Sequence, residues 1–450
     1  MLSEAKITAV IIMIRRTVLE WKSLPYGEGA DQIPELMAER LLAVARALSL
    51  GGEEGANILT RGHRQIKAKQ VVGVIVAEGC CLEILPKIDF PSKDEQIQFG
   101  GIRQRLVHML AVALDINIDV GATTDLDWQR DTLLEILISV FSSKLADAVR
   151  QGMPRRYVAH EEDLPTLRGR LDVIRQFTKL AVSPQILACR YDELSPDIAL
   201  NQIMKATVSL LLKVSRSASN QRRLRELAFA YADITEAPRQ ALRWDDVVLD
   251  RTNARWRELL EMARLFLGQR FQTTSAGGGR GFSLLFEMNT LFEEYVGRIA
   301  KKAFKGCRVT LQGPQKHLAV DTRQNNVIAL QPDVVGWQED KDKVKFLWIL
   351  DTKWKPLSVE KRRENVQQAD LYQMYAYASC YDCSYIVILY PHHRELDGEA
   401  GVRHTYKLNP WAQTDEPDRL VRVATIDLSD LKTVQGQLSE IMEIALSRAD

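Results

Sequence analysis

The strongest chemical signal in the sequence is a set of charged residues that lie next to two apolar segments. Asp333 precedes one such segment, and Asp351 and Lys353 follow the apolar run 346–350. Side chains alternate along a strand, so Asp351 and Lys353 would share a face. Two carboxylates beside a lysine suit Mg²⁺, an activated water and a phosphodiester substrate. The alternative is a salt bridge at the strand end, between Asp351 and Lys353 or Lys355.

A second group of polar side chains lies in the segment 365–381, which has helical periodicity. Asp370, Gln373 and Tyr377 fall at positions i, i+3 and i+7, so they share one face of the predicted helix. An amide and a phenol can each hydrogen-bond to a water or to the backbone, and we expect Gln373 and Tyr377 to tune the site. The alternative is that Tyr377 is an ordinary half-buried aromatic residue.

The elements around these residues follow a recognisable order. The patterns predict a helix over 286–304, strands over 307–320, 326–337 and 343–355, a helix over 365–381 and a strand over 384–391. The polar residues 338–342 predict a turn between the second and third strands, which would therefore form a hairpin. Such a hairpin would bring Asp333 beside Asp351. The order is αβββαβ, and a carboxylate on one of the three glutamates of the first helix could add a ligand.

The rest of the chain predicts an α+β protein with further parts. Residues 1–120 form a mixed α/β region, in which Val71–Ala77 and Cys81–Pro86 form a hairpin. Residues 121–272 are mainly helical, either as an interaction arm or as the core of a helical domain, which periodicity does not separate. A Gly-rich segment then leads into the domain of the charged residues, 273–450.

Composition bounds the class of protein. The chain has 450 residues, of which 46% are apolar and 26% charged, which excludes a disordered or disulfide-rich protein. The net charge of +1 is too small for a strongly basic nucleic-acid-binding protein, so DNA would have to be held by a local patch or by a partner.

Further features bear on location and on nucleotide use. The six scattered cysteines are typical of a reduced cytosol. The apolar run 7–14 is too short to span a membrane, and its arginines follow it where a signal peptide would carry them in front. We therefore expect a cytoplasmic protein with no membrane segment. The sequence contains no Walker A pattern, so we expect that this chain does not hydrolyse a nucleotide.

Asp333, Asp351-x-Lys353 and Gln373-x-x-x-Tyr377, in this order of elements, resemble the PD-(D/E)XK nuclease superfamily and its RecB-like branch. The wider chain resembles the McrC family, the nuclease subunit of McrBC-type modification-dependent restriction systems. The segments that carry this resemblance are LEILPKI (82–88), LRGRLDV (167–173), CRYDELSPDIALNQIMKA (189–206), MNTLFEEYV (288–296), LQPDVV (330–335), LDTKWK (350–355) and DLYQMYAYA (370–378).

The resemblance implies a restriction-endonuclease-like C-terminal α/β domain that cleaves DNA with Mg²⁺, or with Mn²⁺. Asp333, Asp351 and Glu293 would bind the metal, Glu293 because Leu-Phe-Glu at 291–293 matches the family's helix pattern. Lys353 would position the attacking water. A solvated helix charge is the alternative for Glu293.

The resemblance also implies a partner, an AAA+ GTPase ring of the McrB type. That ring, rather than this chain, would bind GTP, and it would recognise 5-methylcytosine in double-stranded DNA. The N-terminal part of this chain would insert into the ring and stimulate GTP hydrolysis. Positions in family-like segments that could reach the ring, or could equally be structural, are Arg168, Arg170, Arg190 and Asn201.

Two rival functions remain open at this stage. The first is a stand-alone RecB-like nuclease, which would cleave DNA without a GTPase. The second is a non-catalytic scaffold that regulates a ring NTPase and carries a decayed nuclease fold. The intact Asp–Asp–Lys set argues against decay.

Overall fold

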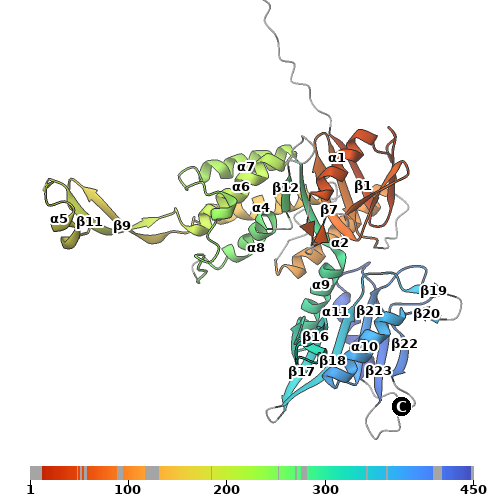
Figure 1. Ribbon diagram of the computed structural model, residues 1–450. Helices are drawn as coiled ribbons and strands as arrows, with labels where there is room; N and C mark the ends of the chain where they lie inside the picture. The colour runs from red at the N-terminus through yellow and green to blue at the C-terminus, as the bar shows by residue number, and fades with distance from the viewer. Residues whose placement is uncertain are drawn as a thin grey trace, which may run out of the picture. The chain divides into compact units, whose positions relative to one another are not determined.

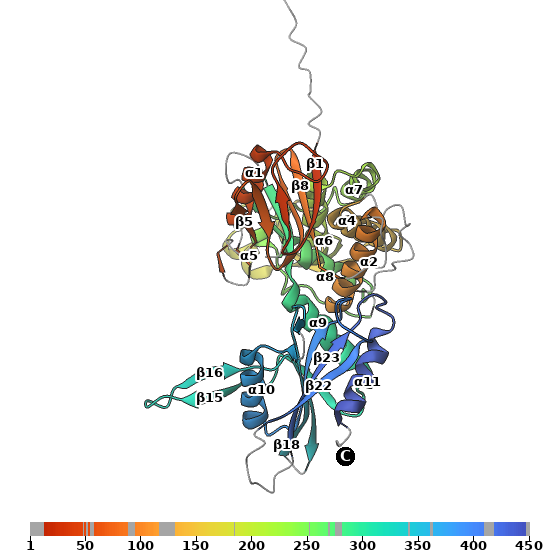
Figure 2. The ribbon, with the colours of Figure 1, turned by 90° about the vertical axis from the view of Figure 1, so that its right-hand side faces the viewer.

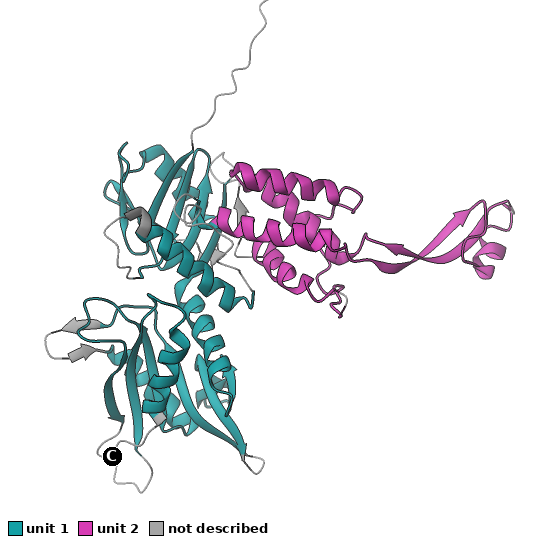
Figure 3. Ribbon diagram, turned by 180° about the vertical axis from the view of Figure 1, so that it is seen from behind, with its two compact units in different colours: residues 1–133, 272–450 teal, residues 134–271 magenta. Residues whose placement is uncertain are grey.

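The structure is a computed structural model that describes residues 13–47, 49–50, 53–54, 58–88, 95–116, 131–183, 185–251, 253–268, 271–274, 281–340, 343–360, 363–408 and 418–446. The chain divides into two compact units, residues 1–133 with 272–450 and residues 134–271, which Figure 3 distinguishes by colour. The mixture of sheets and helices confirms the predicted α+β class.

The amino-terminal part of the first unit is built on a five-stranded sheet with the order β1-β8-β7-β13-β12. Its strands are β1 (Ile14–Leu19), β7 (Val71–Ala77), β8 (Cys80–Leu85), β12 (Phe271–Thr274) and β13 (Gly281–Glu287). The hairpin predicted around residues 78–79 is confirmed, because β7 and β8 pair antiparallel there. Gly73 permits the close pairing of β7 with β13, since its φ is +132° and a Cβ would lie 2.0 Å from the carbonyl oxygen of Leu284.

Smaller elements complete this part of the chain. They are the sheet β2-β6-β5 (Ser23–Pro25, Gln65–Ala68, Leu59–Gly62), the pair β3 (Ser49–Leu50) and β4 (Glu53–Glu54), and the helices α1 (Glu35–Arg46) and α2 (Glu95–Ala113). Helix α1 buries Ala38, Leu41 and Leu42 in an apolar core shared with the strands. The apolar face at i, i+3 and i+4 is the pattern that predicts this helix.

The second unit contains the helices that the sequence predicts and a sheet that it does not. The helices are α4 (Leu133–Arg150), α5 (Val173–Thr178), α6 (Ala199–Val214), α7 (Ala218–Ala230), α8 (Trp256–Leu267) and the 3₁₀ turn η3 (Arg239–Ala241). Between α4 and α6, strands β9 (Arg156–Leu164) and β11 (Leu187–Ser195) form a long antiparallel pair, joined by β10 (Arg170–Leu171). Figure 1 shows this β9–β11 arm extending from the helices, with α5 at its far end.

The sequence analysis does not predict this arm within the mainly helical region 121–272. Most residues of β9 are exposed, so the strand lacks the alternation of apolar and polar side chains by which strands are recognised. The sequence pattern predicts a long helix over 126–150, and its first residues, 126–130, lie outside the described residues.

The carboxyl-terminal part of the first unit is a six-stranded sheet with the order β14-β17-β18-β21-β23-β22. Its strands are β14 (Arg308–Leu311), β17 (Val334–Asp340), β18 (Lys343–Thr352), β21 (Tyr385–Pro391), β22 (Gly401–Leu408) and β23 (Arg419–Ile426). Helices α9 (Met288–Ala303), α10 (Gln368–Tyr381) and α11 (Val434–Leu446) accompany it. Strands β17 and β18 pair antiparallel, which confirms the predicted hairpin.

Two of the predicted strands are interrupted. The segment 307–320 divides into β14 and β15 (Lys316–Val320), and 326–337 divides into β16 (Asn326–Leu330) and β17. Strands β15 and β16 pair with each other as a separate hairpin, which Figure 2 shows projecting from the sheet. The break follows Gln312, whose φ of 47° is left-handed, and it coincides with Gly313-Pro314. A second small hairpin joins β19 (Ser358–Glu360) to β20 (Arg363–Asn365).

The domain boundary that the sequence predicts at residue 273 lies close to the end of the second unit at residue 271. The first long strand after this boundary pairs with a strand of the amino-terminal sheet, which the sequence does not predict. Residues 281–287 form β13, which pairs with β7 of the amino-terminal sheet before the chain enters α9. No described helix is long and apolar enough to cross a membrane.

Candidate active site

The two carboxylates lie at the same end of the β17–β18 hairpin. Asp333 directly precedes β17, and Val334 pairs with Leu350 of β18, so the next register step places Asp333 opposite Asp351. Asp351 is the penultimate residue of β18, which is flanked on its other edge by the parallel strand β21. A central, buried strand therefore delivers a charged side chain at the end of an apolar run.

Asp333 is oriented by the residue between the other two charged groups. Its Oδ2 accepts hydrogen bonds from the Thr352 amide at 2.7 Å and from the Thr352 hydroxyl at 2.8 Å. Burial raises the pKa of Asp333 above its ordinary value, while the two hydrogen bonds oppose that shift. The carboxylate therefore has a fixed orientation beside Asp351.

Asp351 is 1% exposed, and its carboxylate is only partly compensated. Oδ2 lies 2.5 Å from Nζ of Lys353, whereas Oδ1 has no hydrogen-bond donor among the described residues. Burial, and next the charge of Asp333, raise the pKa of Asp351 to about 7. A buried carboxylate with an unpaired oxygen is costly, which makes a structural role alone a poor explanation of it.

Lys353 is held by a chain of hydrogen bonds from helix α10. Its Nζ donates to Oε1 of Gln373 at 3.1 Å, and Nε2 of Gln373 donates to the Tyr377 hydroxyl at 2.8 Å. That hydroxyl donates to the carbonyl of Gln331 at 3.2 Å. Burial lowers the pKa of Lys353, but the charge and hydrogen bond of Asp351 and the charges of Asp333 and Asp370 together outweigh burial, so the net direction is upward. The ammonium group is therefore charged and fixed beside the carboxylates.

Glu293 on α9 faces the same carboxylates. Burial raises the pKa of Glu293 to about 7, with the charges of Asp333 and Asp351 adding to the rise and a hydrogen bond from the Gln312 side chain opposing it. Gln312 also donates its backbone amide to the carbonyl of Asp333 at 2.7 Å. The structure thus gathers the predicted residues from α9, β17, β18 and α10.

The next lysine of the strand has a separate partner. Nζ of Lys355 lies 2.7 Å from Oδ2 of Asp370, which also accepts a hydrogen bond from the Tyr390 hydroxyl at 3.0 Å. Asp370 and Gln373 therefore share the helix face that the i, i+3 spacing predicts. Because Lys355 is engaged by Asp370, it does not compete with Lys353 for Asp351.

The donor atoms at this site suit a hard divalent cation. Asp333 and Asp351 offer carboxylate oxygens only, and the free Oδ1 of Asp351 is the atom that a cation would satisfy. In the part of the chain that the structure describes, no three His, Cys, Asp or Glu side chains converge closely enough to form a metal-binding group. Mg²⁺ commonly uses one or two carboxylates and completes its shell with waters and phosphate oxygens.

The four residues proposed to reach a partner lie on or near the β9–β11 arm and differ in their surroundings. Asn201 is fully buried and its Nδ2 donates to the carbonyl of Pro154 at 2.8 Å, which indicates a structural role. Nη2 of Arg168 lies 3.2 Å from Oε1 of Glu193, and Nη2 of Arg190 lies 2.7 Å from Oδ2 of Asp172, so each arginine forms an ion pair. Arg170 is exposed and forms no ion pair with a described residue.

Sequence reasoning missed the residues that orient the site from outside the motif. Thr352 sits within the Asp-x-Lys motif, but its hydrogen bonds to Asp333 depend on the register of the hairpin. Trp354 donates its indole N–H to Glu20 at 2.8 Å and stacks edge-on against Phe292, with ring centres 5.3 Å apart. These partners lie too far apart in the chain for any local pattern to link them.

Comparison with known proteins gives a family and a fold. A family model described as McrBC 5-methylcytosine restriction system component matches residues 66–391. No curated protein matches the chain.

Two solved structures resemble the chain along much of its length. A chain of the refined half-complex from the tetradecameric assembly of Thermococcus gammatolerans McrB AAA+ hexamers with bound McrC is 20% identical, with a TM-score of 0.68, over 96% of this chain and 99% of that one. A chain of the cryo-EM structure of the Thermococcus gammatolerans McrBC complex is 24% identical, with a TM-score of 0.51, over 64% of this chain and 88% of that one. At these identities the likeness concerns the fold.

Proposed function

The chain belongs to the McrBC 5-methylcytosine restriction system component family, and from that premise we propose that it is the DNA-cleaving subunit of such a system. Its carboxyl-terminal domain would be a PD-(D/E)XK endonuclease that hydrolyses phosphodiester bonds. The single observation that carries the proposal is the buried Asp351 carboxylate, with one oxygen unpaired, between Asp333 and the fixed ammonium of Lys353.

Each residue has a defined task in this proposal. Asp333 and Asp351 would hold Mg²⁺, or Mn²⁺, with Glu293 reaching the ion directly or through a water. The bound ion would lower the pKa of a water and offset the charge of the scissile phosphate. Lys353 would orient the attacking water and stabilise the negative charge that develops on the phosphate. Gln373 and Tyr377 would keep Lys353 in place through the hydrogen bonds described above.

The proposed partner is an AAA+ GTPase ring. One of the similar structures contains McrB AAA+ hexamers with bound McrC, and the present chain has no nucleotide motif of its own. We propose that such a ring binds GTP and recognises double-stranded DNA with 5-methylcytosine, while this chain stimulates GTP hydrolysis and cuts the translocated DNA.

The β9–β11 arm is the part best suited to contact the ring. Apolar side chains are exposed at its α5 end, where Ile174 is 78% and Phe177 72% exposed. Exposed apolar side chains in a cluster are typical of an interaction surface. Arg170, exposed and without an ionic partner among the described residues, is the arginine of the arm that we propose for a contact with the ring.

Reconstitution tests the proposal. The full chain is incubated with and without its cognate GTPase, with methylated or unmethylated plasmid, GTP and Mg²⁺, and double-strand breaks and GTP turnover are measured together. We expect breaks only with partner, GTP and methylation, and none with Asp351→Ala. Breaks by the chain alone would indicate a stand-alone nuclease, and raised GTP turnover without any breaks would indicate a scaffold.

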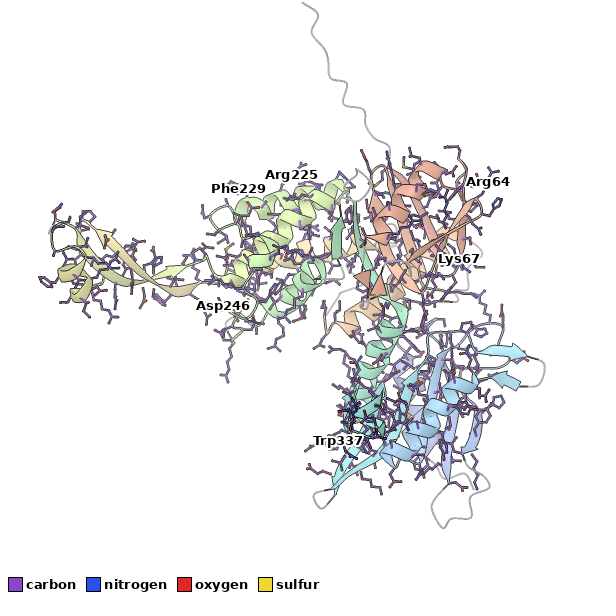
Figure 4. The ribbon with its side chains drawn as sticks, in the orientation of Figure 1. Arg64, Lys67, Arg225, Phe229, Asp246 and Trp337 are labelled. Carbon is purple, nitrogen blue, oxygen red and sulfur yellow. The ribbon has the colours of Figure 1, made fainter. Side chains whose placement is uncertain are left out.

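The arm can be tested in the same assay. Replacing Ile174 and Phe177 by serine should reduce the stimulation of GTP hydrolysis by about tenfold, because the apolar contact area is lost. The matched control is Phe229→Ser, since Phe229 is also exposed but lies on α7, where Figure 4 shows it on the outer side of the helix. Equal stimulation by the double variant and the control would contradict a role of the arm.

A further inference from the structure

An exposed tryptophan with lysines around it lies at the end of strand β1. Trp21 is 47% exposed, and the ammonium groups of Lys67 and Lys69 lie 5.9 and 5.7 Å from the centre of its ring. Its φ of 63° is left-handed, a conformation that a bulky residue adopts only when its surroundings enforce it. The side chain is thus held on the surface, where its ring attracts two cations.

More positive charge surrounds this ring. Lys22 is the next residue in the chain, and Arg64 lies at the turn between β5 and β6, the latter being the strand of Lys67. Figure 4 shows Arg64 and Lys67 on the outer side of the small sheet β2-β6-β5. These residues and Lys69 give four cations around the ring, and none of the four forms an ion pair with a described residue. We call Trp21, Lys22, Arg64, Lys67 and Lys69 the Trp21 patch.

A cavity adjoins the patch and continues its charge. It has a volume of about 410 Å³ and is lined by Lys22 together with Arg15 and Arg16 of β1. Among the described residues that line it, Asp31 is the one acid. An excess of positive charge beside an exposed aromatic ring is typical of a nucleic-acid-binding surface.

The patch is joined to the candidate active site through Trp354, the residue after Lys353. The indole of Trp354 donates to Glu20 at 2.8 Å, and its carbonyl accepts from Gln70 at 3.0 Å. Trp21 follows Glu20 and Lys69 precedes Gln70, so each lies about 3.8 Å, Cα to Cα, from a residue that contacts Trp354. The side chains of Glu20 and Gln70 therefore tie the segments that carry Trp21 and Lys69 to the residue that follows Lys353.

We infer that the Trp21 patch binds the phosphate backbone of duplex DNA beside the scissile phosphate. Its occupant is a polyanion because the patch offers four cations and no acid. It is duplex DNA because the neighbours of Trp21 and Lys69 in the chain contact Trp354, which follows Lys353 of the site proposed to cut DNA. Trp21 acts by holding the ammonium groups of Lys67 and Lys69 in place rather than by reading bases. This inference rests on the proposed nuclease function. Because the chain is nearly neutral, a nuclease of this kind needs a local basic patch to hold DNA.

Salt-dependent binding tests the inference without cleavage. The full chain is titrated onto a fluorescein-labelled 30-bp unmethylated duplex in EDTA, between 50 and 200 mM salt, and the anisotropy is measured. Lys67→Gln with Lys69→Gln should weaken binding at least tenfold and reduce the salt slope by about two, since each phosphate contact contributes about 0.9. Trp21→Leu should weaken binding about two- to fivefold, as expected for lost cation–π contacts.

The control is Lys213→Gln with Lys432→Gln, which removes the same charge from exposed lysines elsewhere in the chain. An equal salt slope for the two double variants would overturn the inference, as would tighter binding of the single strand than of the duplex, or no binding by the wild type. Circular dichroism checks that the variants fold. Patch-dependent binding without any cleavage would contradict the nuclease proposal alone, whereas cleavage with patch-independent binding would contradict the patch alone.

Discussion

Two carboxylates in the same unit, Glu83 on β8 and Asp351 on β18, are each 1% exposed, yet their surroundings differ. The Glu83 carboxylate accepts hydrogen bonds from the Arg103 guanidinium at 2.6 Å, from the Leu133 amide at 2.8 Å and from the Thr17 hydroxyl at 3.0 Å. Asp351 has one ion pair and an oxygen without a donor among the described residues. The first carboxylate is fully satisfied by the fold, whereas the second is satisfied only when something else binds.

Glu83 and Asp351 show two ways in which a folded protein can accommodate a buried carboxylate. A carboxylate whose oxygens are all paired ties elements of the fold together, as Glu83 ties β1, α2 and the start of α4. A carboxylate left open beside a second one destabilises the protein unless a cation or a proton compensates it. Substitutions at the two sites should therefore have opposite signatures in activity and stability.

DNA cleavage should depend most strongly on Asp351. Asp351→Asn should reduce DNA cleavage by the reconstituted complex by about a thousandfold, because a metal ligand and its charge are lost. The free energy of unfolding should not fall. Asp382→Asn is the control, since that aspartate is 91% exposed. Cleavage within tenfold of wild type would contradict the role of Asp351.

Substitution at the Glu83–Arg103 pair should change stability and leave DNA cleavage nearly unchanged. Arg103→Met should lower the free energy of unfolding by about 3–5 kcal/mol, because Glu83 would remain buried without its cation. Cleavage per folded molecule should stay close to wild type. Arg61→Met, whose ion pairs are at the surface, should cost less than about 1 kcal/mol in chemical denaturation. Equal losses for the two arginine variants would refute the comparison.

The open site should also make stability depend on pH. The pKa of Asp351 is raised to about 7, so its protonated form is favoured in the folded state. The stability that protonation gives is present at low pH and is lost as pH rises from about 4 through 7. Relative to Asp351→Asn, the wild type should therefore lose stability between pH 5 and pH 8 without divalent ions. Urea unfolding at several pH values measures the difference in stability between wild type and Asp351→Asn. A difference that does not change with pH would contradict the raised pKa of Asp351.

The smallest effects should come from two threonines that occupy equivalent roles. Thr352 donates its hydroxyl to Asp333 at 2.8 Å, and Thr17 donates its hydroxyl to Glu83 at 3.0 Å. Each valine variant should lose about 1 kcal/mol of stability. Only Thr352→Val should also reduce cleavage, by about tenfold, because Asp333 loses its orientation. A similar drop in Thr17→Val would show that cleavage merely follows stability.

The sequence predicts the hairpin and its charged residues because the signals are local. Strong apolar runs define β17 and β18, the polar turn sets their pairing, and the period of two fixes Asp351 and Lys353 on one face. Gln373 and Tyr377 follow in the same way from helical spacing.

What the sequence does not predict depends on contacts between distant segments. Glu20 and Trp354 are joined across the chain, and Gln312 reaches Glu293 through a left-handed turn. The sequence does not predict the β9–β11 arm, because β9 is mostly exposed and lacks the alternation of apolar and polar side chains that identifies a strand. Each depends on tertiary structure that periodicity does not encode.

Titration calorimetry can determine whether the open carboxylate pair, Asp333 and Asp351, is a divalent-cation site. Mg²⁺ and Mn²⁺ are titrated separately into the full chain, its Asp351→Asn variant and its Glu83→Gln variant. We expect wild type and Glu83→Gln to bind alike, and Asp351→Asn to bind at least tenfold more weakly. Equal binding of both ions by wild type and Asp351→Asn would contradict a divalent-cation site at this pair.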